Sequence, residues 1–222
     1  MDWQALTLSL SLGLYTCAVL IPLATVTARI LAWRRFPGKH LLQAMLALPL
    51  LLPPTVLGFY LLLALGDHSP LGKGYESLFG QPLVFSFQGL LIASFIFNIP
   101  FAVQPIQRAF EAVPETIREA AWCSGLSHWL TFWKVEFPLA WPGILAAIII
   151  TLAHTLGEFG VILMVGGNIQ GETRTLSVAI YDRVQAFDNH SAGVMSALLL
   201  LVAFTAITAI YSLNDKLSRR YD

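Results

Sequence analysis

Charged residues are scarce in this chain of 222 residues: Lys, Arg, Asp and Glu together make up 12%, and 13 basic residues balance 13 acidic ones. A soluble domain is about one quarter charged, so this composition excludes an ordinary soluble domain. The apolar share is 56% and the mean hydropathy is +0.69, as is typical of a membrane protein. We therefore expect membrane lipid around the chain and no nucleic-acid partner.

Cysteine is also rare, with two residues in the whole chain. Cys17 falls inside an apolar segment and Cys123 inside a polar one, so the two thiols are not expected to pair. We interpret both as packing residues rather than redox groups.

A nucleotide-binding motif is missing. Residues 66–74 look like a phosphate-binding loop, but five residues separate Gly66 from Gly72, where the motif has four. Gly74 also stands where Ser or Thr would bind magnesium. We therefore expect no nucleotide site, no cofactor and no catalytic residue, and the chain is not expected to be an enzyme.

Long apolar segments dominate what remains, and there are five: 6–31, 41–65, 89–106, 139–165 and 192–213. About 20 helical residues cross a bilayer, so each segment is long enough to span. The first is too long for the apolar region of a cleavable signal and lacks a basic start. The chain contains no low-complexity linker or clear repeat. This pattern predicts an all-α, polytopic membrane helix bundle of about five transmembrane helices, forming a single domain over residues 1–222.

Basic residues predict the orientation, because cytoplasmic loops are enriched in Lys and Arg. With five spans, one face receives ten basic residues and the other receives three. The ten are Arg29, Arg34, Arg35, Lys39, Arg108, Arg118, Lys134, Lys216, Arg219 and Arg220; the three are Lys73, Arg174 and Arg183. We therefore expect the N-terminus outside and the C-terminus in the cytoplasm.

The most distinctive stretch is a polar and aromatic island, residues 111–142, between two apolar segments. Pro114 suits a first helical position, and Gly125 stands where that helix would stop. Ser127 can cap a second short helix, which Pro138 is expected to end. In that helix Trp129, Phe132 and Trp133 recur at helical spacing. The island thus predicts a helix–Gly–helix hairpin on the cytoplasmic face.

The spacing inside this island matches a known motif. Glu119-Ala120-Ala121 is followed after three residues by Gly125, and after nine more by Val135, one residue and Phe137-Pro138. This stretch resembles the EAA loop of binding-protein-dependent ABC importer permeases. Val135 and Phe137 replace the more usual Ile and Leu. The alternative is an ordinary interfacial helix pair.

Three further stretches resemble molybdate-type permeases and their sulfate relatives. They are Phe36-Pro37-Gly38-Lys39, the run 155–160 with its Gly-Glu-Phe-Gly, and the run 168–176, where Gln170 replaces a usual Pro. The resemblance covers nearly the whole chain. It implies the permease subunit of a molybdate ABC importer with the type I importer fold; sulfate/thiosulfate and tungstate permeases are the alternatives.

The resemblance also implies partners and the residues that meet them. A cytosolic ABC ATPase dimer would bind the coupling loop at about 111–138, through Glu115, Arg118, Glu119, Ala120, Ala121, Gly125 and Pro138. A second copy of the chain would share the path, and a periplasmic or lipoprotein oxyanion-binding protein would deliver the substrate. The location would be the bacterial inner membrane, with a periplasmic N-terminus.

Candidate pathway residues are polar or helix-breaking groups inside the apolar segments. They are Pro53, Pro54, Asn98, Gln104, Thr155 and Glu158. A mid-span proline frees carbonyls, which either a water-filled path or a packed kink can accommodate. Asn98 and Gln104 fit either a path or interhelical hydrogen bonds.

His154 and Glu158 lie one helical turn apart, with Glu158 expected at the outer interface, either solvated or paired with His154. A metal site there would lack a third ligand, so no metal is expected. A stand-alone secondary transporter or channel, or an intramembrane enzyme, would have to use this pair. Beyond it, Leu176, Ile180, Val184 and Phe187 predict one apolar face of a short amphipathic helix.

Overall fold

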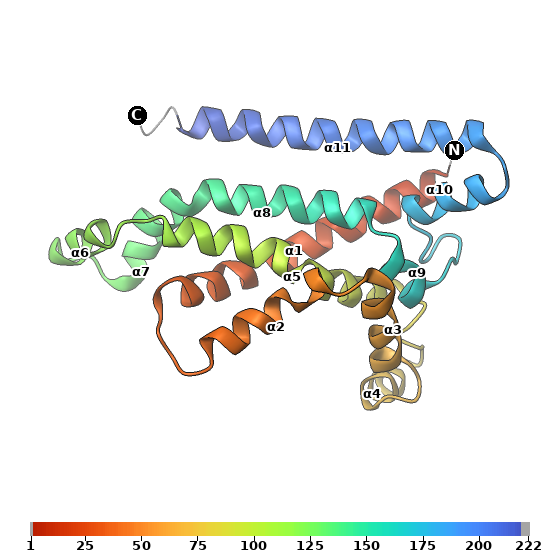
Figure 1. Cartoon of the computed structure of the whole chain (residues 1–222), viewed down its shortest axis with the longest axis horizontal. Helices are drawn as coiled ribbons and strands as arrows, with labels where there is room; N and C mark the ends of the chain where they lie inside the picture. The colour runs from red at the N-terminus through yellow and green to blue at the C-terminus, as the bar shows by residue number, and fades with distance from the viewer. Residues whose placement is uncertain (1, 219–222) are drawn as a thin grey trace.

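The computed structural model describes residues 2–218, and every regular element in that range is helical. This confirms the all-α prediction. Four of the helices are long and apolar enough to cross a membrane (Figure 1). They are α1 (Trp3–Trp33), α5 (Phe87–Glu111), α8 (Phe137–Gly157), whose span begins with the helical turns from His128, and α11 (Asn189–Ser218).

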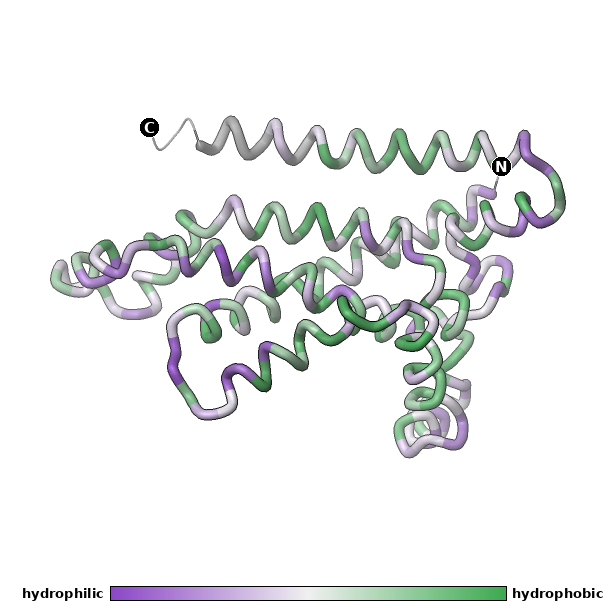
Figure 2. The backbone as a smooth tube through the Cα atoms, in the orientation of Figure 1, coloured by the Kyte–Doolittle hydropathy of each residue, from purple (hydrophilic) through white to green (hydrophobic). Residues whose placement is uncertain are grey.

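The helices α1, α5 and α8 pack against one another, and α11 lies along α8 (Figure 1). Small residues allow the close approach: a Cβ on Gly143 of α8 would lie 2.3 Å from the Cβ of Ala109 on α5. Such contacts are typical of helices that pack in lipid. Large apolar side chains nevertheless remain exposed along α11, including Leu200 and Phe204. Figure 2 shows hydrophobic residues along the long helices and hydrophilic ones gathered in the end segments.

The remaining predicted span, residues 41–65, is broken. It consists of α2 (Lys39–Leu51) and α3 (Pro54–Leu65), and the chain bends by 111° between them. Leu52 and Pro53 between them are extended, because a residue before proline avoids the helical conformation. Pro54 then begins α3, where its missing N–H leaves no hydrogen bond unmade.

Short helices cover the end of the bundle at which α1 begins. There α3 packs on α9 (Gly160–Gly166), and α4 (Pro70–Phe79) lies between the apolar segments 41–65 and 89–106, where the sequence analysis assigned no helix. Ser69 explains α4, because its hydroxyl accepts a hydrogen bond from the N–H of Gly72 at 2.8 Å. The apolar segment 139–165, which we predicted as one span, forms two helices: α8 ends at Gly157, and α9 follows it.

The amphipathic helix α10 (Leu176–Gln185) forms where expected, but its predicted apolar face is wrong at Phe187. This residue lies beyond the helix end, has φ +58°, and is 89% exposed. The residues that α10 buries are Leu176, Val178 and Ala179.

The segments carrying the basic residues sort to the two ends of the bundle. The α1–α2 turn, α6 (Glu115–Cys123) and η1 (Phe132–Glu136) lie at one end, and α4 and α10 lie at the other (Figure 1). Of the ten residues predicted to be cytoplasmic, Arg219 and Arg220 lie outside the described residues.

Candidate functional site

The polar island folds into the predicted hairpin at the end of the bundle opposite α10 (Figure 1). Its helices are α6, α7 (His128–Thr131) and the π-helical turn η1, which runs directly into α8. Pro114 precedes α6 as its N-cap rather than forming its first residue, and Glu115 opens the first turn. A carboxylate there faces the positive end of the helix dipole.

The turn after α6 depends on Gly125, which has φ +85°. The N–H of Gly125 donates to the carbonyl of Trp122 at 2.9 Å, and the N–H of Leu126 donates to that of Ala121 at 3.1 Å. This pair of bonds is a Schellman motif, which needs a left-handed residue at the position of Gly125. Ser127 then caps α7, as expected, by accepting from the N–H of Leu130. A Cβ on Gly125 would meet no atom within 4 Å, so the constraint comes from its backbone angle rather than from crowding.

Helix α6 has one open and one covered face. The open face carries the exposed residues Glu115, Thr116, Glu119, Ala120 and Cys123. The covered face carries Ala121, which is buried, and Arg118, whose side chain is 12% exposed. Of the predicted docking residues, Glu115, Glu119 and Ala120 therefore share a surface, whereas Arg118 and Ala121 face the protein.

Pro138 does not end the second helix, which corrects the expectation. The π turn η1 precedes it, and the chain continues into α8 without a break. In this turn the N–H of Phe137 donates to the carbonyl of Phe132, five residues back. The wider turn alters the hydrogen-bond register just where proline, without an N–H, could not continue it. Trp133 and Phe137 pack along the turn, with ring centroids 5.2 Å apart.

The last residue of η1 is one that the sequence analysis missed. Glu136 is 0% exposed, and its carboxylate accepts hydrogen bonds from Arg29 of α1 at 2.6 Å and Arg118 of α6 at 3.3 Å. It occupies the position that the motif leaves unspecified, between Val135 and Phe137. The only signal was a carboxylate next to an apolar span.

Two pathway candidates, Asn98 and Thr155, are buried inside the bundle. The side-chain N–H of Asn98 donates to Thr155 Oγ1 at 2.9 Å and to the carbonyl of Ser94 at 2.8 Å. Ser94 in turn accepts from Thr16 of α1 at 2.9 Å. This neutral cluster joins α1, α5 and α8, which favours the interhelical interpretation of Asn98 over the path.

Gln104 has a different setting, because it lines two cavities, one between α1, α2 and α5 and the other between α2, α5 and α8. The cavities measure about 260 and 440 Å³. Both are also lined by Pro100 and Arg108. Pro53 and Pro54 are exposed at the bend between α2 and α3. The structure therefore does not bring the six pathway candidates together.

We expected Glu158 to be either solvated or paired with His154, and the structure shows neither. Its side chain is buried, with 8% exposed, and among the described residues it forms no ion pair with His154. Its Oε1 accepts the N–H of Val161 at 2.9 Å and so satisfies the start of α9. The ring Nδ1 of His154 lies instead 3.3 Å from Asn98 Oδ1, and its ring packs against Phe101. Within residues 2–218, no three His, Cys, Asp or Glu residues cluster as metal ligands.

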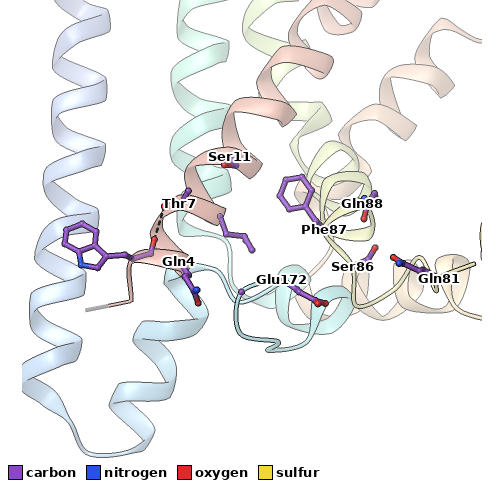
Figure 3. Close-up of a pocket in the computed structure, with 11 residues that line it drawn as sticks. Gln4, Thr7, Ser11, Gln81, Ser86, Phe87, Gln88 and Glu172 are labelled. Carbon is purple, nitrogen blue, oxygen red and sulfur yellow. Dashed lines mark hydrogen bonds between the residues drawn. The ribbon is translucent and has the colours of Figure 1, made fainter. Parts of the chain in front are cut away.

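The opposite end of the bundle has a polar pocket of about 680 Å³ that the sequence analysis did not find. Figure 3 shows that its residues come from the start of α1, the loop before α5, the first turn of α5 and the loop before α10. Its labelled polar side chains are Gln4, Thr7, Ser11, Gln81, Ser86, Gln88 and Glu172. The lining is mostly uncharged, with Glu172 as its one acidic member.

The loop before α10 is held by a short polar chain. Arg174 Nε donates to Asn168 Oδ1 at 2.6 Å, and Asn168 Nδ2 donates to Asp182 Oδ2 at 2.7 Å. Gly171 provides the turn with φ +83°. These residues of the run 168–176 therefore shape the loop that borders the polar pocket.

Sequence comparisons identify related proteins over most of the chain. Residues 21–222 match the family described as "Binding-protein-dependent transport system inner membrane component". The molybdenum transport system permease protein ModB of Azotobacter vinelandii is 44% identical over 220 residues, 99% of this chain and 95% of that protein. ModB of Haemophilus influenzae is 34% identical over 222 residues, covering 99% and 95%.

A relative that matches a shorter part of the chain is the probable sulfate transport system permease protein cysT of Marchantia polymorpha. It is 35% identical over 182 residues, which cover 80% of this chain and 63% of that protein. Its presence means that sequence similarity extends beyond the molybdenum permeases.

Solved structures share the fold at low sequence identity. The inward-facing MetNI methionine ABC transporter gives a TM-score of 0.73 at 16% identity, covering 97% of this chain and 94% of that chain. A bacterial alginate ABC transporter, solved in complex with its periplasmic protein, gives 0.76 at 16%, covering 93% and 76%. The helical arrangement is therefore that of type I ABC importer permeases.

Proposed function

Because this chain belongs to the family of binding-protein-dependent transport system inner membrane components, we propose that it is the permease subunit of an ATP-driven importer for molybdate. The observation that carries the proposal is the hairpin α6–α7–η1, whose open face projects from a bundle of membrane-spanning helices. The substrate follows from the 44% identity to a molybdenum permease.

The energy for transport comes from a separate cytosolic ATPase dimer. The stretch 66–74, which resembles a phosphate-binding loop, is occupied in part by α4 and has no nucleotide-binding role in this proposal. The open face of α6 docks on the ATPase, with Glu115 and Glu119 offering carboxylates and Ala120 permitting close approach. Arg118 and Ala121 support that surface from within, Gly125 forms the turn that follows it, and Pro138 lies in the first turn of α8.

The membrane orientation places the hairpin in the cytoplasm and the N-terminus in the periplasm of a bacterial inner membrane. Support comes from the unequal distribution of basic residues between the two ends. A periplasmic or lipoprotein oxyanion-binding protein then meets the end that carries α4, α10 and the polar pocket.

Two copies of the chain share one path, since each copy presents one hairpin to a paired ATPase. The broken span at Pro53 and Pro54 and the cavities beside Gln104 line this path, and Asn98, Thr155 and Glu158 hold the helices around it. Amide and hydroxyl groups pass an oxyanion without trapping it. ATP binding and the loaded binding protein both favour the outward-open arrangement, which couples the two sites.

A sulfate or tungstate importer is the alternative, and the similarity to a sulfate permease favours sulfate. The test is uptake into proteoliposomes that contain the chain, its ATPase and its binding protein. Molybdate uptake that requires ATP, with weaker competition by sulfate than by tungstate, supports the proposal. Flux without ATP or without the ATPase would instead identify a stand-alone transporter or channel.

A further inference from the structure

Glu136 is a carboxylate that joins three separate elements at the inner end of the bundle. It belongs to η1, Arg29 belongs to α1, and Arg118 belongs to the coupling helix α6. Arg29 Nε is 2.6 Å from Oε2, and Arg118 Nε is 3.3 Å from Oε1. Each oxygen thus serves a different helix, so the carboxylate fixes where α6 stands relative to α1.

Aromatic rings hold the two guanidinium groups in place. Arg118 lies 3.7 Å above the ring of Trp33 from α1 and 5.1 Å from the ring of Trp122 from α6. Arg29 lies 5.5 Å from the same Trp33 ring and 5.3 Å from that of Phe132. Such cation–π contacts are strongest where water is excluded, as it is around a fully buried Glu136.

Few other contacts tie α6 to the membrane-spanning helices. Its main neighbours among the described elements are α7 and η1, which are themselves parts of the hairpin. A displacement of α6 can therefore reach α1 through Arg118, Glu136 and Arg29, and can reach α8 through η1. The π-helical form of η1 suits such a role, because π turns recur at functional sites.

We propose that Glu136 is a positioning residue through which movement of the ATPase-bound helix α6 is transmitted to α1 and α8. The inference rests on the proposed function. The site also requires a negative charge. Without the carboxylate, two guanidinium groups would face each other across a position that is 0% exposed, with Arg118 12% and Arg29 31% exposed. An amide at this position keeps the shape but not the charge, so it should leave α6 free to move without the bundle.

The test is the ratio of molybdate taken up to ATP hydrolysed, measured on the complete complex carrying Glu136→Gln. We expect the complex to assemble and hydrolyse ATP while this ratio falls about tenfold. A purely structural role would reduce the amount of complex and leave the ratio unchanged. Arg35→Gln and Glu76→Gln, two exposed residues outside the hairpin, serve as controls with the ratio of the unmodified protein.

Arg118→Lys is the second variant, because lysine keeps the charge but loses the planar group that lies on Trp33. If Glu136→Gln does not accumulate, the proposal is tested on Arg118→Lys instead, again by the ratio of molybdate taken up to ATP hydrolysed. An unchanged ratio in an assembled complex, or the failure of both variants to assemble, would overturn the proposal. If the unmodified complex shows no ATP-driven uptake, the proposed function fails instead.

Discussion

Two buried glutamates flank α8, and they hold very different partners. Glu136, just before the helix, is shared by two arginines that lie 107 and 18 residues away in the sequence. Glu158, just after it, accepts one backbone N–H three residues further along. A long-range charged contact ties elements together, whereas a local cap only shapes its own turn. In our proposal the end of α8 at Glu136 serves transmission, whereas the end at Glu158 serves local structure.

The largest expected effect is at the inner end, at Gly125. We predict that Gly125→Val abolishes uptake while membrane insertion stays normal, because a β-branched residue at φ +85° disrupts the turn that presents α6. Gly125→Asn is the matched variant, since Asn tolerates the left-handed conformation. Uptake assays and membrane fractionation of both variants provide the measurement.

Retention of most activity by the Asn variant would confirm that backbone conformation is the constraint. Equal loss in both variants would instead indicate that the partner needs the bare backbone at this position. Normal uptake in the Val variant would contradict the assignment of the hairpin as the coupling element.

The proposed path can be tested at Gln104, which lies on α5 beside α8. We predict that Gln104→Glu slows molybdate uptake several-fold, because a carboxylate in the cavities beside Arg108 repels an oxyanion. Gln104→Ala removes the amide without adding charge and serves as the control. Initial uptake rates at low and high salt measure the effect, since salt screens repulsion in an open path. Equal rates for Glu and Ala would remove Gln104 from the path.

The neutral cluster in the middle of the bundle should affect stability rather than coupling. Asn98→Ala removes hydrogen bonds to Ser94 and Thr155, and we expect it to lower the stability of the detergent-solubilised protein by about 1–2 kcal/mol. Thr205→Ala is the control, because Thr205 is exposed and bonds only within its own helix. Thermal unfolding gives the stability, and the uptake-to-ATP ratio should stay unchanged. A fall in that ratio would return Asn98 to the pathway.

The smallest effect is expected at the outer end. Glu158→Gln keeps an oxygen that accepts the N–H of Val161, so stability and uptake should both match the unmodified protein. Glu158→Leu removes that acceptor and should cost about 1 kcal/mol in thermal unfolding. The same Glu-to-Gln change thus has opposite outcomes at the two ends of α8. Loss of uptake in Glu158→Gln would contradict the proposed difference between Glu136 and Glu158.

The parts of this architecture that depend on local chemistry were predictable from sequence. Gly125 and Ser127 act within three residues of themselves, and Pro53 and Pro54 act on their own backbone. Each therefore leaves a readable pattern. The bend at Pro53 was anticipated, although its angle of 111° was not.

The parts that depend on distant partners were not predictable. Glu136 finds Arg29 107 residues away, and Asn98 finds Thr155 57 residues away, so neither pairing leaves a local spacing to read. Pro138 was misread for a related reason. A π turn absorbs the proline, and no residue pattern in η1 announces that turn.

Cys123 offers the most direct measurement, because it is an exposed native thiol on the open face of α6, whereas Cys17 lies within α1. A membrane-impermeant maleimide should label Cys123 in inside-out vesicles and not in right-side-out ones. Assembly with the ATPase should block that labelling. Labelling from the periplasmic side, or labelling that the ATPase leaves unchanged, would contradict the claim that this face of α6 receives the force for transport.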